Sequence, residues 1–263
     1  MTAIQVRKVV ILGSGTSTGV PVVGCSCEVC RSEDPYDKRT RCSILLELTN
    51  DKRIVVDTSP EFRLQLLANK IDRIDAVLYT HTHADHCHGF DDLRVFSFFR
   101  KDPLPVFLAP DHATEIRERF HYAFENTGYE GATPQLQLHE IGKDTFDVLG
   151  LPVEPVYLPH GGVTTTAYRF GDFAYATDFK GFPPEVLAKW QGRVPTMVAS
   201  AIRYRPHSTH SNIPETLDLF AKLGVKQGFL THLSHDVGYG RDSGKLPPGA
   251  ALAYDGMVID LLP

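Results

Sequence analysis

The strongest constraint in this chain is a group of metal-ligand residues directly after an apolar run. The segment YTHTHADHCHGF spans residues 79–90 and follows IDAVL at residues 74–78. Side chains two positions apart on a strand point the same way, so His81 and His83 can bind one cation together. Asp85 and His86 come after the chain has turned and can face a second cation beside the first. Four ligand-type residues at this spacing predict a metal centre at the end of a buried strand.

Composition excludes several classes of protein. The chain has 263 residues, 42% of them hydrophobic and 22% charged, which predicts a single domain over residues 1–263 with one large core. No apolar stretch reaches the roughly 18 residues of a membrane helix. The N-terminal MTAIQVRKVVILG indicates a first strand and not a signal peptide. A formal net charge of −5 gives no basic face by composition, so a nucleic acid is not the expected partner.

Short strand-like runs alternate with turns along the whole chain. Candidate helix starts are Ser59-Pro60-Glu61 and Asn212-Ile213-Pro214-Glu215. Many strands with few helices predict an α/β (α+β) chain with two packed sheets flanked by helices. The expected strands are Lys8–Leu12, Ser43–Leu48, Arg53–Val56, Ala76–Tyr79, Pro105–Leu108, Leu151–Tyr157, Thr165–Phe170, Phe173–Ala176, Thr196–Ala199, Gln227–Leu230 and Met257–Ile259.

Two neighbouring cations need more ligands than one loop supplies. Three further candidates each lie just beyond an apolar run, as His81 does. His160 follows LPVEPVYLP, Asp178 ends FAYATD and His232 ends QGFLTH. Their shared position predicts that distant strand ends complete the site.

These residues in this order resemble the metallo-β-lactamase superfamily of binuclear hydrolases, over nearly the whole chain. The resemblance implies an αββα four-layer sandwich with the metals at one edge of the sheets. It also implies that Asp57, in IVVDTSPEF, orients the metal loop from outside the ligand set. Carried over by position, the first metal takes His81, His83 and His160, the second takes Asp85, His86 and His232, and Asp178 bridges both.

A second motif, GCSCEVC, places Cys25, Cys27 and Cys30 close enough to bind one tetrahedral zinc that lacks only a fourth ligand. The alternative is a set of free thiols or a disulfide, although these spacings strain a bridge. Three cysteines within six residues suit a metal in a reducing cytoplasm. The motif resembles the phosphoribosyl 1,2-cyclic phosphate phosphodiesterase (PhnP-like) branch of the superfamily, which implies His235 as the fourth ligand. GSGTSTGVPVVGC, DTSPEF and the late DGM resemble the same branch.

The expected function is that of a binuclear metal-dependent phosphodiesterase. A pair of cations activates water and neutralises charge on a phosphoryl group. Asp85 belongs to this catalytic set, and the leaving oxygen then needs a proton. In RPHSTHSNIPE the resemblance implies that His210 is the acid, with His207 as the alternative. The expected substrate is a small cyclic phosphodiester such as phosphoribosyl 1,2-cyclic phosphate or a cyclic nucleotide.

Other functions compete with this one. A tRNA 3′-processing nuclease shares the metal set but carries a long basic arm, and no such insertion stands out here. A thioester or lactam hydrolase of the same fold is a further alternative, although zinc lactamases use a cysteine that the Asp178 region lacks. A metal sensor without activity would not need His210. The expected cofactors are two catalytic divalent metals, Mn or Zn, and one structural Zn. The expected partner is a small phosphodiester substrate, and no membrane partner is expected. A homodimer is compatible with the sequence.

Three remaining features have simpler interpretations. LGSGTSTGVP lacks the Lys-Ser/Thr of a P-loop and the full dinucleotide glycine pattern, so it is a turn-rich segment near the cleft. Cys42 and Cys87 are expected to be small buried residues. The other histidines, His88, His112, His121 and His139, have no partner at metal-binding spacing and are expected to be solvated or packed.

Overall fold

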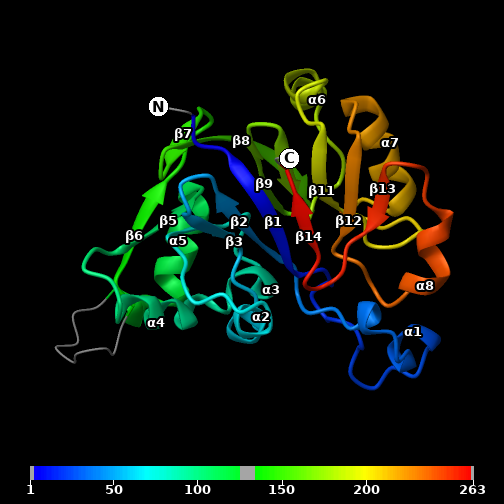
Figure 1. Cartoon of the computed structure of the whole chain (residues 1–263), viewed down its shortest axis with the longest axis horizontal. Coiled ribbons are helices and arrows are strands. Elements are labelled where there is room, and N and C mark those ends of the chain that lie inside the picture. The colour runs from blue at the N-terminus through cyan, green and yellow to red at the C-terminus, as the bar shows by residue number, and fades with distance from the viewer. Residues whose placement is uncertain (1–2, 125–133, 262–263) are drawn as a thin grey trace.

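The structure, a computed structural model, describes residues 3–124 and 134–261 and contains two mixed seven-stranded sheets packed face to face (Figure 1). The first sheet has the order β14 (Val258–Asp260), β1 (Val6–Gly13), β2 (Ser43–Leu48), β3 (Arg53–Val56), β4 (Ala76–Leu78), β5 (Leu104–Leu108) and β6 (Leu136–Glu140). The second has the order β13 (Ala250–Leu252), β12 (Gln227–Thr231), β11 (Thr196–Ser200), β10 (Phe173–Ala176), β9 (Val163–Phe170), β8 (Leu151–His160) and β7 (Phe146–Val148).

Helices cover the outer face of each sheet. The first sheet is covered by α2 (Phe62–Ala68) and α5 (Pro110–Arg119), with α3 (Ala84–Cys87), η2 (Phe90–Leu93) and α4 (Arg94–Ser97) beside them. The second is covered by α6 (Pro184–Trp190) and α7 (Ile213–Leu223). Short segments complete the chain: α1 (Glu28–Arg31), η1 (Pro35–Asp37), η3 (His121–Ala123), α8 (Tyr239–Asp242) and η4 (Ser243–Lys245). Within the described ranges, no helix has both the length and the apolar character that crossing a membrane requires.

Three hydrophobic cores separate the four layers. Strand β1 shows how, because its alternate side chains serve different cores. Val9 and Ile11 pack between the two sheets, whereas Val10 and Leu12 pack under the helices of the first sheet. A third core lies between the second sheet and its helices, where Trp190 is completely buried. The αββα sandwich expected from the sequence is therefore confirmed.

The topology brings many strand ends to one edge. Strands β3 to β6 are mutually parallel, and so are β10 to β13. The loops after parallel strands leave a sheet on one side, where ligand sites of such sheets form. The loop after β4 and the loops after β10 and β12 therefore approach one another across the sandwich.

The strand predictions agree with the structure to within a few residues, but β6, β7 and β13 were missed. The predicted helix start at Asn212 is confirmed, since its side chain and that of Glu215 form a reciprocal capping box. The predicted cap at Ser59 is wrong. Helix α2 begins at Phe62, and the Ser59 carbonyl instead accepts from the Phe62 amide in a preceding turn.

Gly89 allows the chain after α3 to pass close to the start of α2. A Cβ at this position would lie 2.3 Å from the Ser59 carbonyl oxygen and 2.7 Å from the Phe62 Cβ. We expect Gly89→Ala to lower the free energy of unfolding by about 1–3 kcal/mol, the usual cost of overpacking. Gly142→Ala is the matched control, because nothing lies within 4 Å of a Cβ there. Urea unfolding of both variants tests this, and equal stabilities would contradict it.

Candidate metal centre

Seven histidine and aspartate side chains meet at the edge where the strand ends converge. Two sets of donor atoms form there, and within each set all atoms lie within 4.8 Å of one another. One set is His81, His83, His160 and Asp178, and the other is Asp85, His86, Asp178 and His232. The residues come from the loop after β4, from α3, from the last position of β8 and from the positions just past β10 and β12. The structure thus brings together all seven residues predicted for the binuclear site.

Asp178 belongs to both sets and is 2% exposed. Its Oδ2 lies 3.1 Å from His86 Nε2 and 3.4 Å from His81 Nε2. Its Oδ1 lies 3.0 Å from His232 Nε2. Asp178 Oδ2 thus contacts histidines of both sets, and Oδ1 faces the second set, so this carboxylate lies between the two sets as a shared ligand would.

The backbone at the strand ends is strained. Asp57, Asp178 and His232 have φ values of 65°, 51° and 56°, in the left-handed region that residues other than glycine rarely adopt. All three follow strands and are buried. Strain of this kind costs of order 1–3 kcal/mol per residue and concentrates at functional sites.

Outer hydrogen bonds fix which nitrogen of His86 and of His160 faces the cluster. His86 Nδ1 donates to Asp57 Oδ2 at 2.7 Å, and His160 Nδ1 donates to the Thr209 carbonyl at 3.2 Å. Asp57 in turn accepts from the Thr80 amide and hydroxyl, both at 2.8 Å. These bonds leave the Nε2 lone pairs directed inward, the arrangement typical of metal-binding histidines. The expected outer position of Asp57 is confirmed.

Several inward nitrogens lie near the Asp178 carboxylate but make no hydrogen bond of good geometry with any described residue, including His81 Nε2, His86 Nε2 and His232 Nε2. Burial lowers the pKa of His81 to about 3. Burial also opposes the charged form of His232, but the Asp178 carboxylate raises the pKa of this imidazole to about 10. Orphaned imidazole nitrogens around two buried carboxylates suit divalent cations, which fit this donor set.

A cavity of about 260 Å³ opens onto the two donor sets. Asp178 and His210 line it, as do the predicted turn residue Ser17 and the tip of the β8–β9 hairpin at Gly161 and Gly162. His210 stacks on His232 with ring centroids 5.1 Å apart, and its unpaired Nδ1 lies 3.6 Å from Asp178 Oδ1.

His207 does not line this cavity. Its Nδ1 accepts a hydrogen bond from the Thr209 amide at 3.3 Å, so this nitrogen is used within the 207–209 turn. Of the two candidates for the acid, His210 is therefore the one that faces the donor sets.

Helix α5 holds the loop between His81 and His83, a feature that sequence reasoning missed. The Thr82 hydroxyl donates to Glu115, and the Thr82 carbonyl accepts from Arg119. Arg119 also pairs with Glu115 at 3.0 Å, so the three groups form a closed network. No local pattern signals it, because the partners lie more than thirty positions apart.

Two of the residues expected to be merely packed also contact this loop. The ring of buried His112 lies between Thr82 and the Thr164 carbonyl of β9, with Nε2 2.9 Å from that oxygen. Cys87 is buried as expected, and its thiol donates to the Thr82 carbonyl at 3.3 Å. Cys42 is buried as well, within 3.2 Å of the Tyr175 hydroxyl.

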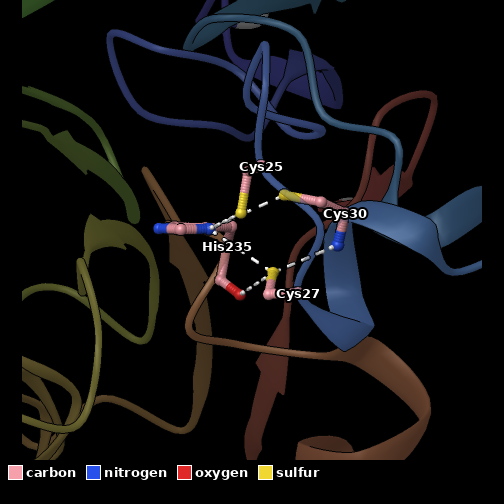
Figure 2. Close-up of side chains that lie close together, drawn as sticks. All are labelled: Cys25, Cys27, Cys30 and His235. Carbon is pink, nitrogen blue, oxygen red and sulfur yellow. Dashed lines mark hydrogen bonds between the residues drawn. The ribbon is translucent and has the colours of Figure 1, made fainter.

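The cysteine motif forms a separate cluster with His235 (Figure 2). His235 Nδ1 lies 3.3 Å, 3.5 Å and 3.6 Å from the sulfur atoms of Cys25, Cys27 and Cys30. Zinc–ligand bond lengths in a tetrahedral site require S···N separations of about 3.5 Å, so these four side chains fit one zinc ion. The Cys30 amide donates to Cys27 and helps to lower the pKa of that thiol to about 6. All five cysteines are free, which rules out the alternative of a disulfide in this structure.

Buried polar contacts fix the loops around this cluster. The Arg39 guanidinium donates to the Val237 carbonyl at 2.8 Å and pairs with Asp37 at 3.0 Å. Asp255, from the DGM segment, accepts from the amides and hydroxyls of both Ser14 and Thr40 at 2.6–2.9 Å. The segment that carries His232 and His235 is thereby tied to the N-terminal loops.

Comparisons with known proteins agree with this geometry. A beta-lactamase superfamily domain model matches residues 52–233. The crystal structure of a new diphosphatase from the PhnP family is 35% identical, with a TM-score of 0.91, and the match covers 98% of both chains. Zinc-bound PqqB from Methylobacterium extorquens has a TM-score of 0.77 at 20% identity, covering 97% of this chain and all of that one, and supports the fold alone.

Two curated relatives match over part of their length. An octanoyltransferase of Porphyromonas gingivalis is 41% identical over 253 residues, which are 95% of this chain and 51% of that protein. The chain thus spans about half the length of this relative. Coenzyme PQQ synthesis protein B of Methylorubrum populi is 34% identical over 114 residues, 38% of each chain.

The family model spans more than half of the chain, and the PhnP-family structure matches nearly all of it at 35% identity. The histidine and aspartate clusters supply the donor atoms that metal-dependent members of such a family need. The chain belongs to the metallo-β-lactamase superfamily, in its PhnP-like branch, and is a metal-dependent hydrolase.

Proposed function

We propose that this hydrolase is a binuclear phosphodiesterase that cleaves a small, cyclic phosphodiester such as phosphoribosyl 1,2-cyclic phosphate or a cyclic nucleotide. One observation carries the proposal. His210 lies in the same small cavity as the two donor sets but belongs to neither of them. An imidazole in that position is suited to give a proton to a departing oxygen. A hydrolase that had only the metals would lack this proton donor.

The ligand assignment follows the two donor sets. We assign His81, His83 and His160 to the first metal. Asp85, His86 and His232 are assigned to the second, with Asp178 shared. Divalent cations in such a pair of sites supply an activated water nucleophile and neutralise charge on a phosphoryl group. The histidine and carboxylate donors accept either Zn or Mn, and the cysteine cluster is assigned to one structural Zn.

The chain's own residues position the substrate and its leaving group. Gly161 and Gly162 let the β8–β9 hairpin form a wall of the cavity without side chains, so a phosphate group can approach the donor sets. His210 lies beside this hairpin, with its ring centroid 4.7 Å from that of His160, and it stacks on His232. Burial lowers the pKa of the His210 ring to about 3, and an anionic phosphate bound beside the ring would raise that pKa, so that a proton on the ring can pass to the oxygen that leaves phosphorus.

Cavity size and similarity both support a small phosphoryl substrate. The volume of about 260 Å³ suits one phosphodiester with a compact organic group and not a folded RNA. The PhnP-family relative with 35% identity is named a diphosphatase, and cleavage of a phosphoric anhydride also releases an oxygen from phosphorus.

A thioester hydrolase is the second candidate. The relative with 41% identity is named an octanoyltransferase, although this chain matches only about half of it. A thiolate leaving group needs little help from an acid, so such an activity would leave His210 without this role. Turnover of an octanoyl thioester, assayed beside the phosphodiesters, distinguishes the two candidates.

The first prediction tests His210 as the acid. His210→Ala should lower turnover of a cyclic ribose phosphate by about 10²–10⁴-fold, because an alkoxide is a poor leaving group. It should lower turnover of bis(4-nitrophenyl) phosphate far less, with both catalytic metals retained. Asp178→Ala is the contrast, since loss of the shared carboxylate should impair both substrates and release metal. An equal loss on both substrates for His210→Ala would contradict the role.

The second prediction tests the structural zinc. Cys27→Ser should remove about one equivalent of zinc per chain and lower the melting temperature, because a four-ligand site contributes folding energy directly. Cys42→Ser is the matched control, since Cys42 is buried but lies outside the cluster. Elemental analysis after dialysis measures the zinc. If Cys27→Ser retained the same zinc content as Cys42→Ser, the assignment would be wrong.

The third prediction tests the support of the metal loop by α5. Thr82→Val keeps the side-chain shape but removes the hydroxyl that donates to Glu115. We expect the affinity for the catalytic metals to fall by about 10–100-fold, as for other outer partners of metal ligands. Thr82→Ser should retain wild-type affinity. Competition with a chelator measures this, and indistinguishable Val and Ser variants would reject the role.

A further inference from the structure

His207 closes a tight turn in the loop between β11 and α7. Its Nδ1 accepts a hydrogen bond from the Thr209 amide at 3.3 Å, and the Thr209 hydroxyl lies 3.4 Å from the same nitrogen. Asparagine and aspartate side chains commonly close such a turn, because they accept from the amide two positions further on. The His207 ring takes the place of that acceptor here, and its centroid lies 4.9 Å from that of His210.

Thr209 joins three parts of the catalytic cavity, which it also lines. Its carbonyl accepts from His160 Nδ1 at 3.2 Å. Its methyl group packs against the hairpin tip, where a Cβ on Gly161 would lie 3.0 Å from Thr209 Cγ2. His210 is the next residue in the chain, with its ring centroid 4.7 Å from that of His160. The position of Thr209 therefore affects a proposed metal ligand, a cavity wall and the proposed acid.

The backbone supports His210 on one side only. After it, the Ser211 amide donates to the Phe179 carbonyl at 2.7 Å. Before it, residues 204–210 form no backbone-to-backbone hydrogen bond with any described residue. A buried or half-buried backbone amide needs a partner. The side-chain bond within the 207–209 turn thus supplies the support that the main chain lacks.

The charge state of His207 suits an acceptor. Burial lowers the pKa of the His207 ring below its usual value, and the charges of Arg203 and Lys180 act in the same direction. A neutral ring keeps a lone pair on Nδ1 for the Thr209 amide. A proton on that nitrogen would instead place two donors face to face.

We infer that His207 is a positioning residue, whose ring holds the Thr209 carbonyl against His160 and holds His210 at the cavity. If the acceptor were lost, the Thr209 amide would turn to water and both histidines would lose this constraint. The effect on His210 rests on the proposed function, in which that ring gives a proton. The effect on His160 rests only on the assigned metal ligands.

Two substitutions of nearly equal shape test the inference. Asparagine places an acceptor oxygen where Nδ1 lies, and leucine places a methyl group there. His207→Leu, with metal saturating, should lower turnover of a cyclic ribose phosphate by about 10–100-fold, because a small misplacement of a reacting group can cost this much. It should lower turnover of bis(4-nitrophenyl) phosphate far less. His207→Asn should recover the turnover, although it has no imidazole and cannot act as an acid.

Metal affinity provides a readout that does not depend on turnover. By competition with a chelator, His207→Leu should bind the weaker catalytic metal about 10–100-fold less tightly than the wild type, the usual effect of losing an outer support of a ligand. His207→Asn should bind it as the wild type does. If the wild type cleaved neither phosphodiester, the proposed function would fail, and this comparison would still test His207.

A Leu variant that matched the Asn variant in either measurement would overturn the inference. So would an equal loss of turnover on both substrates. Circular dichroism checks that both variants fold, and His207→Ala, which also lacks the acceptor, replaces the Leu variant if that one does not.

Discussion

The site is organised around one buried carboxylate. Asp178 lies within 3.0–3.8 Å of nitrogen atoms from five histidines: His81, His86, His160, His210 and His232. A carboxylate removed from water needs a compensating positive charge. With only protein around it, that charge comes from protonated imidazole, which is why the pKa of His232 is raised to about 10. A divalent cation that binds there must replace those protons, so metal affinity and pH are linked at this site.

The ends of the strands position Asp178 and the residues around it. Asp57, Asp178 and His232 each leave a strand in the left-handed conformation, and this turn directs the side chain back across the sheet edge. The strands themselves are buried on both faces and cannot shift without disturbing two of the three cores. Tight packing therefore holds a backbone geometry that a surface loop would relax away from.

The sequence predicted what depends on local spacing, and little of what depends on distant contacts. In the segments His81–His86 and Cys25–Cys30, the spacing of ligand-type residues within a few positions is enough to predict metal binding. His160 and Asp178 were found because each follows an apolar run. In contrast, Thr82 with Glu115 and Arg39 with Val237 are joined only by the fold. The strands that were missed, β6, β7 and β13, are all edge strands, where weaker burial leaves a weaker apolar pattern.

The two clusters are mechanically connected, because the proposed catalytic ligand His232 lies three positions before the proposed zinc ligand His235. Leu233, between His232 and His235, pairs with Gly15, and the Leu233 amide donates to the Ser14 carbonyl at 2.9 Å. Ser14 is held by Asp255, and Ser17, three residues further on, lines the catalytic cavity. Tightening the cysteine cluster therefore fixes both a ligand and a wall of the cavity. This edge of the domain is made of loops, and such a metal cluster would give the loops the rigidity that strands supply elsewhere in the fold. That would explain why a structural metal lies so close to a pair of catalytic metals.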